Sequence, residues 1–180
     1  MTDFFYFADL TWPEVADLPR DCPLVIPLGM GYPMQEVAEA LGNPPRAGTL
    51  PPIPYGWRGS GLAVPEALLG TYVRNLLDSL RDDGFSRVFV LTPQGIELGL
   101  SSDRLALPST APTAIPLPPD DQRGKVILIP VGHIEQHGFH LPLSVDTLCI
   151  EAVARGTASA APDKAFTLPV MPYGVSTHRA

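Results

Sequence analysis

Residues 126–132 read Val126-Ile127-Leu128-Ile129-Pro130-Val131-Gly132, a short and continuously apolar run that ends in a glycine. A run of this kind is typical of a β-strand that is covered on both faces in a parallel sheet. Three further runs have the same character, at 24–28, 87–92 and 165–170. We therefore expect four buried strands, all of the kind found in parallel sheets.

Helical patterns lie between these runs. Apolar residues recur at helical spacing from Leu68 to Leu80, and Asp82-Asp83-Gly84 then predicts a turn that ends the helix. A second helix, built from smaller residues, is predicted to begin near Asp146 and to continue towards Gly156. Strands that alternate with helices place the chain in the α/β class, with a mainly parallel sheet flanked by helices.

The chain also contains an internal repeat. Pro23-Leu24-Val25-Ile26-Pro27-Leu28-Gly29 resembles residues 126–132 at an offset of 103, and Leu50-Pro51-Pro52-Ile53-Pro54-Tyr55-Gly56 resembles residues 168–174 at an offset of 118. The order of the two blocks is the same in both copies, and the second copy is 15 residues longer between them. We expect both copies to share one supersecondary structure.

A proline-rich segment separates the copies. Residues 101–124 contain five prolines among Ser, Thr and Ala, with neither helical nor alternating periodicity. This composition favours an extended linker. The predicted organisation is a first copy at 1–100, a linker at 101–124 and the N-terminal part of a second copy at 125–180.

Composition restricts the classes of partner. Twelve Lys+Arg against 19 Asp+Glu give a formal net charge of −7, and no cluster of basic residues is present. Nucleic acid and anionic membranes attract concentrated positive charge, so neither is expected as a partner. No apolar run has the length of a membrane span, and the N-terminus lacks the features of a signal peptide, which together predict a cytoplasmic protein. Cys22 and Cys149 are expected to be two buried thiols rather than a disulfide.

The chemistry is concentrated after the strand at 126–131. Three of the four histidines, His133, His137 and His140, occur within eight residues. Glu135 and His137 are two residues apart, so in extended backbone their side chains point to the same side, and Asp146 can return to them at the start of the next helix. One imidazole and two carboxylates suit Zn²⁺, Mn²⁺ or Fe²⁺. The segment follows a parallel strand, where α/β sheets place their ligands.

These residues carry a resemblance. The pattern Gly132-x-x-Glu135-Gln136-His137-Gly138-x-His140-Leu141-Pro142-Leu143-x-x-Asp146-Thr147 resembles the metal-binding motif of the creatininase (creatinine amidohydrolase) family. The later stretch Pro169-Val170-Met171-Pro172-Tyr173-Gly174-x-Ser176 resembles the next strand and loop of that family. The first copy resembles the family more weakly, through Leu10-Thr11-Trp12-Pro13-Glu14-Val15 and residues 84–91.

The resemblance implies an α/β fold and a centre of two divalent metal ions. It implies that Glu135 and His137 each hold one metal, that Asp146 bridges the pair, and that His140 has a second-shell or substrate-side catalytic role. It further implies hydrolysis of a C–N amide or lactam bond in a small molecule, and a homo-oligomeric assembly. Metal-activated water would attack the carbonyl.

The two copies are predicted to differ in their ligands. At the offset of 103, Tyr32 corresponds to Glu135 and Met34 to His137, so the first copy is expected to be degenerate and free of metal. Where the family has an Asn-Gly-His loop with further ligands, the first copy has Thr92-Pro93-Gln94-Gly95-Ile96-Glu97. An alternative is that Gln94 and Glu97 donate ligands to the second copy.

The second copy stops at Ala180, before the position of that later loop. We expect the missing His and Glu to come from a longer chain or from another subunit. The competing hypothesis is a non-catalytic, creatininase-like binding or assembly subunit, and the activity of these 180 residues alone is an open question.

Overall fold

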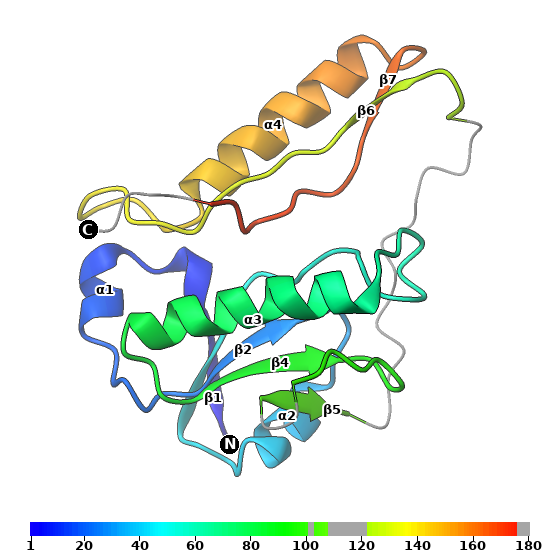
Figure 1. Cartoon of the computed structure of the whole chain (residues 1–180). Helices are drawn as coiled ribbons and strands as arrows, with labels where there is room; N and C mark the ends of the chain where they lie inside the picture. Colours follow the sequence, from blue (N-terminus) through cyan, green and yellow to red (C-terminus); the bar gives the residue numbers. More distant parts are fainter. Residues whose placement is uncertain (101–102, 108–121, 176–180) are drawn as a thin grey trace. The chain divides into compact units, whose positions relative to one another are not determined.

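The computed structural model describes residues 1–100, 103–107 and 122–175 (Figure 1). The chain divides into two compact units. The first contains Met1–Phe7 and Leu18–Ile115, and the second contains Ala8–Asp17 and Pro116–Ala180. The second unit therefore includes a short segment from near the N-terminus.

The first unit contains a five-stranded sheet in the order β1-β3-β2-β4-β5. All four neighbouring pairs are parallel, which confirms the predicted α/β class with a mainly parallel sheet. The strands are β1 (Asp3–Tyr6), β2 (Leu24–Pro27), β3 (Arg46–Thr49), β4 (Val88–Thr92) and β5 (Arg104–Ala106).

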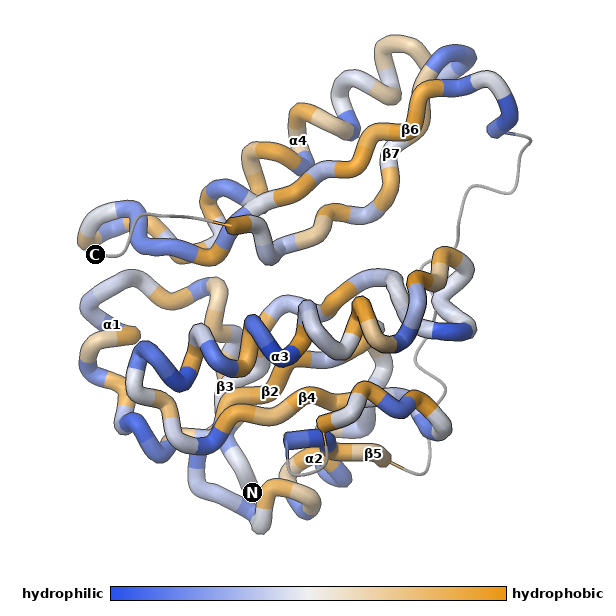
Figure 2. The backbone as a smooth tube through the Cα atoms, in the orientation of Figure 1, coloured by the Kyte–Doolittle hydropathy of each residue, from blue (hydrophilic) through white to orange (hydrophobic). Residues whose placement is uncertain are grey.

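Helices cover this sheet on both faces (Figure 1). The central strands β2 and β4 are among the most apolar segments in Figure 2, and every residue of β2 is buried. Val37 of α2 (Met34–Ala40) packs in one core cluster with Val25 and Leu91. The 17-residue helix α3 (Glu66–Asp82) buries Leu69, Val73 and Leu77, as its apolar stripe predicts.

The second unit contains a two-stranded parallel sheet of β6 (Val126–Leu128) and β7 (Ala165–Thr167). Helix α4 (Val145–Ala160) lies between them in sequence and extends four residues beyond the predicted Gly156. The segment Ala8–Asp17 adds the short helix α1 (Trp12–Ala16), which follows the 3-10 turn η1 (Phe7–Asp9).

The strand β5 lies inside the range predicted as a linker. It pairs with β4, so Arg104–Ala106 belongs to the first sheet. Residues 101–102 and 108–121 of the predicted linker lie outside the described part of the chain.

The prediction of two buried thiols is wrong for one of them. Both cysteines are free, but only Cys22 is buried, and Cys149 is exposed on α4.

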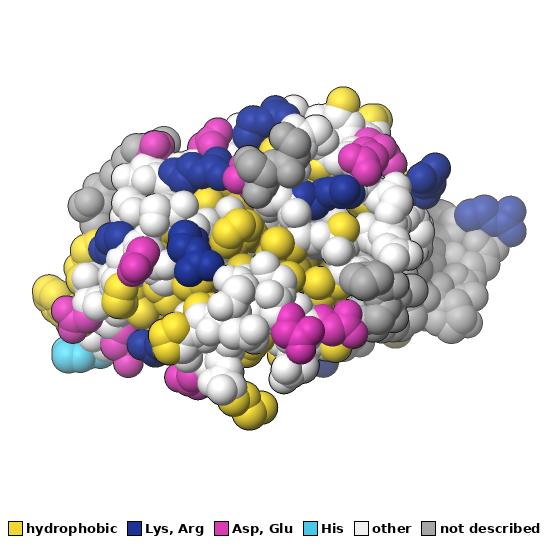
Figure 3. Space-filling model, turned by 90° about the horizontal axis from the view of Figure 1, so that it is seen from below, with side chains coloured by type: hydrophobic (Ala, Val, Ile, Leu, Met, Phe, Trp, Pro, Cys, Tyr) yellow, Lys and Arg dark blue, Asp and Glu magenta, His cyan; other side chains and the backbone are white. Residues whose placement is uncertain are grey.

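The face drawn in Figure 3 carries Lys, Arg, Asp and Glu side chains interspersed with one another rather than separated by sign. Among the described residues, no helix combines the length and apolarity needed to cross a membrane.

Candidate metal centre

The loop between β6 and α4 contains a tight turn at Gly138 and carries the ligand-type side chains. Gly138 has a φ of 73°, a conformation that side-chain-bearing residues rarely adopt. Its N–H donates a 3.0 Å hydrogen bond to Oε1 of Gln136. Gln136 and Gly138 therefore shape the turn. Glu135 and His137 supply side chains to the site.

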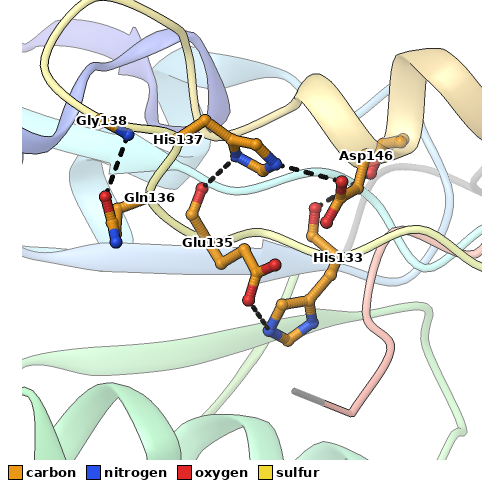
Figure 4. Close-up of polar contacts among 7 residues, drawn as sticks. His133, Glu135, Gln136, His137, Gly138 and Asp146 are labelled. Atoms are coloured by element: carbon orange, nitrogen blue, oxygen red, sulfur yellow. Dashed lines mark hydrogen bonds and ion pairs between the residues drawn. The ribbon is translucent and has the colours of Figure 1, made fainter. Parts of the chain in front are cut away.

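The turn groups Glu135 and His137 with Asp146, the second residue of α4 (Figure 4). Each offers one ligand atom, and these three atoms lie within 4.8 Å of one another. Their side chains are 26%, 22% and 39% exposed, respectively, so the group is partly buried and still reachable from solvent. The structure thus brings together the three residues predicted as metal ligands.

The ring of His137 is held by the backbone on one side and faces Asp146 on the other. Its Nδ1 lies 3.0 Å from the backbone carbonyl oxygen of Glu135, and its Nε2 lies 3.1 Å from Oδ1 of Asp146. A carbonyl oxygen can only accept, so Nδ1 carries the proton in that hydrogen bond. Metal-binding histidines are commonly oriented in this way, because the second ring nitrogen is then left to face the ion.

Close packing sets the position of Asp146. A Cβ atom on Gly132 would lie 2.6 Å from Cα of Thr147 and 2.5 Å from its Oγ1. The Thr147 hydroxyl also donates a 3.4 Å hydrogen bond to the carbonyl of His133. The start of α4 can approach the end of the β6 segment this closely only because residue 132 has no side chain.

The segment Ala8–Asp17 supports the same region from within the second unit. The N–H groups of Leu143 and Ser144 each donate a 3.0 Å hydrogen bond, to the carbonyls of Leu10 and Ala8 respectively. Ser144 is the N-cap residue of α4, directly before the turn that carries Asp146. An N-terminal segment therefore fixes the entry into the helix that supplies the second carboxylate.

The other residues singled out in the sequence occupy different positions. His140 is exposed and is not part of the three-residue group. Glu97 forms a 3.3 Å ion pair with Arg104 in the first unit. Ser176, in the second matching stretch, lies outside the described residues. The predicted catalytic role of His140 stays a prediction.

Sequence reasoning assigned no role to His133, which the structure places beside the group. Its Nε2 lies 3.8 Å from Oε2 of Glu135. The sequence contained a signal, because His133, Glu135 and His137 follow one another at intervals of two residues. In extended backbone, that spacing places all three side chains on one side.

A pocket of about 470 Å³ adjoins the group and shares Asp146 with it. Its polar lining includes His133, while Ile150 and Val153 of α4 contribute apolar surface. The volume lies within the range of small-molecule sites, roughly 300–1,000 Å³. The arrangement combines a cluster of oxygen and nitrogen donors with space for a small ligand.

Comparison with known proteins agrees with this geometry. Residues 116–180 match the family model described as "Creatininase: Creatinine amidohydrolase". No curated protein and no solved structure matches the chain. The matched range contains β6, the turn, the ligand group and α4. The candidate metal centre therefore lies within the segment, residues 116–180, that is similar to the creatininase family.

Proposed function

We propose that the second unit is the site of a metal-dependent amidohydrolase that cleaves a C–N amide or lactam bond in a small molecule. The observation that carries the proposal is the grouping of Glu135, His137 and Asp146 within 4.8 Å, inside a segment that matches an amidohydrolase family. Zn²⁺, Mn²⁺ and Fe²⁺ are the candidate ions, since all three accept imidazole and carboxylate ligands.

The residues fit such an ion. Oε2 of Glu135 is buried and has no hydrogen-bond partner among the described residues. A buried carboxylate oxygen without a partner is costly, and a bound cation would remove that cost. His137 faces the group with Nε2 while its Nδ1 is engaged by a backbone carbonyl. The site therefore has both the donor atoms and the supporting contact expected of a metal centre.

The chain's own residues would divide the work as follows. Glu135, His137 and Asp146 hold the ion, and the Glu135 carbonyl keeps the imidazole in its binding orientation. The pocket beside Asp146 receives the substrate. When bound, a divalent ion lowers the pKa of a water molecule and polarises the scissile carbonyl. His140, on the same loop, is proposed to act on the substrate side.

The proposal includes a second ion, for which the described residues of this site do not form a complete ligand set. We propose that the remaining ligands come from a longer chain or from another subunit of a homo-oligomer. A non-catalytic binding or assembly role is the competing proposal, and it predicts no stoichiometric metal.

Metal analysis of the purified chain separates these proposals. We expect stoichiometric metal in the wild type and its loss in Glu135→Gln and Asp146→Asn, which remove a charge while keeping side-chain size. Glu151→Gln is the matched control, because Glu151 lies on the same helix and pairs with Arg155 rather than with the ligand group. Hydrolysis of a panel of small linear amides and lactams, measured on the same samples, tests the reaction.

The metal-centre proposal fails if the wild type and the ligand variants carry the same negligible amount of metal after incubation with Zn²⁺, Mn²⁺ or Fe²⁺. Metal binding without hydrolysis of any substrate in the panel would support the metal centre and count against the amidohydrolase. Hydrolysis that disappears in Asp146→Asn and persists in Glu151→Gln would support the amidohydrolase.

A further inference from the structure

His133 faces the carboxylate of Glu135 from the side opposite His137. Figure 4 shows the Glu135 side chain between the two imidazoles, with its Oε2 directed at His133. Nε2 of His133 and Oε2 of Glu135 are 3.8 Å apart. The two side chains are 28% and 26% exposed, so both are largely removed from solvent.

This contact is not a hydrogen bond. A separation of 3.8 Å exceeds the roughly 2.7–3.2 Å of N–H···O hydrogen bonds in proteins. Oε2 of Glu135 has no hydrogen-bond partner among the described residues, and the same holds for Nδ1 of His133. The structure thus directs a ring nitrogen at a buried carboxylate oxygen without joining them.

A cation between the two atoms accounts for this separation. Zinc binds histidine nitrogen and carboxylate oxygen at about 2.0–2.2 Å, so one ion can reach two such atoms that are up to about 4 Å apart. The observed 3.8 Å lies within that limit. The interval of two residues between His133, Glu135 and His137 supplies a backbone reason for all three side chains to converge.

We propose that His133 is a further metal ligand of this site, binding through Nε2 the ion that Glu135 binds through Oε2. The donor set of the second unit then consists of two imidazoles and two carboxylates. The inference rests on the proposed metal dependence and extends it by one residue. It also supplies, from within the described chain, a second histidine ligand for the site.

Counting the imidazoles tests the proposal directly. X-ray absorption spectroscopy of the zinc-loaded full chain reports the number of bound imidazoles through multiple scattering from the rings. We expect two histidines per site in the wild type, one in His133→Ala and one in His137→Ala. His140→Ala tests the third histidine of the loop, which is exposed, and we expect it to keep both bound imidazoles.

Affinity measurements complete the test. Competition with a chromogenic zinc chelator is expected to show at least a tenfold weaker zinc affinity for His133→Ala and an unchanged affinity for Glu151→Gln, whose carboxylate pairs with Arg155 outside the site. His133→Gln distinguishes ligation from hydrogen-bond support, because a glutamine can donate a hydrogen bond to Glu135 but cannot restore an imidazole to the absorption spectrum. Circular dichroism verifies that each variant is folded.

The proposal is overturned if the wild type contains a single imidazole per site, or if His133→Ala binds zinc as tightly as the wild type. In either case, loss of metal in His137→Ala would leave the proposed function standing. A wild-type chain that binds no zinc, manganese or iron would instead contradict both the His133 proposal and the proposed metal-dependent function.

Discussion

The pair β2–β3 in the first unit and the pair β6–β7 in the second have the same register. The offsets of 103 and 118 seen in the sequence map Leu24↔Gly48 onto Ile127↔Phe166, and both pairs occur in the structure. The bridge Leu28↔Ile53 maps in the same way onto Val131↔Met171. The family match covers residues 116–180, so the origin of the first copy in the same family stays a prediction.

The segments that follow the first strand of each pair are different. In the first unit, α2 begins at Met34, the position that corresponds to His137, and it is 7 residues long. In the second unit, a loop intervenes before the 16-residue α4. The hydroxyl of Tyr32, at the position of Glu135, donates a 2.7 Å hydrogen bond to the carbonyl of Leu28. Equal strand pairing therefore supports a helix start in one unit and a ligand-bearing loop in the other.

The largest difference is expected from substitutions at the corresponding positions His137 and Met34. His137→Ala should lower zinc affinity by more than the roughly 10–100-fold that loss of an outer metal-site partner costs. Met34→Ala should leave it unchanged, because Met34 is 38% exposed at the start of a helix and belongs to no ligand group. Isothermal titration of both variants with zinc measures this contrast. Equal zinc affinities in the two variants would contradict the predicted difference between the two positions.

Gly132→Ala should have the next largest effect. The added Cβ would meet backbone atoms of Thr147 at 2.6 and 2.9 Å, which requires the start of α4 to move. Overpacking of this kind costs about 1–3 kcal/mol of unfolding free energy, and a displaced Asp146 should weaken zinc binding as well. Urea denaturation and zinc titration measure the two effects.

Gly156→Ala provides the control on the same helix. Nothing lies within 4 Å of a Cβ at that position, and the residue is exposed in α4. Replacing a helical glycine by alanine should stabilise the chain by about 0.5–1 kcal/mol. If both glycine variants were equally stable, close packing at residue 132 would not control the entry into α4.

Tyr32→Phe tests the position that corresponds to Glu135. It removes hydrogen bonds of 2.7 and 3.3 Å to the carbonyls of Leu28 and Leu91, at an expected cost of about 0.5–1.5 kcal/mol. Zinc binding should not change. Thermal denaturation measures the stability and zinc titration measures the affinity. Unaffected stability or reduced zinc affinity would contradict a purely structural role for Tyr32.

The same variant should alter the response to alkaline pH. Burial raises the pKa of Tyr32 above its ordinary value of 10.0, so the unfolded chain loses that proton at a lower pH than the folded chain. Below about pH 10 the phenol is neutral in both states, and above it the wild type should lose stability as the pH rises. Tyr32→Phe should lose less stability over that range, because it lacks the Tyr32 phenol. Some loss should remain, because burial also raises the pKa of Tyr72, which is unchanged in this variant.

An effect of similar size, confined to stability, is expected at the N-terminal segment of the second unit. The Glu14 carboxylate accepts 2.8 Å hydrogen bonds from the N–H and the hydroxyl of Thr11 at the start of α1. Glu14→Ala should cost about 1 kcal/mol, the usual value of a helix-capping contact. Glu39→Ala is the control, because on the exposed surface of α2 it removes a 3.0 Å hydrogen bond from Gln35 rather than a capping contact. An equal loss of stability in both variants would show that the capping contact adds nothing.

The sequence predicted the strongly apolar elements and missed the others. The strands β2, β4, β6 and β7 and the helices α3 and α4 were found because their apolar residues are continuous or periodic. The predicted burial of all four strands is wrong for β6, because Val126 and Ile127 are exposed and the described β6 pairs with β7 alone. Strand β3 reads Arg46-Ala47-Gly48-Thr49, which has no such pattern. A Cβ at Gly48 would lie 2.6 Å from a Leu24 side-chain carbon. Side chains of the neighbouring strands therefore cover β3, whose own residues are too small to form an apolar pattern.

The sequence by itself determined the α/β class, the parallel strands, the repeat and the identity of the three candidate ligands, because each follows from local composition or fixed spacing. Only the tertiary structure decided that Ala8–Asp17 supports the entry to α4, and that His133 rather than His140 lies beside Glu135. These contacts join residues through a turn or across long stretches of chain. Local periodicity reports which side of an element a residue occupies, whereas backbone packing decides which other residue it meets there.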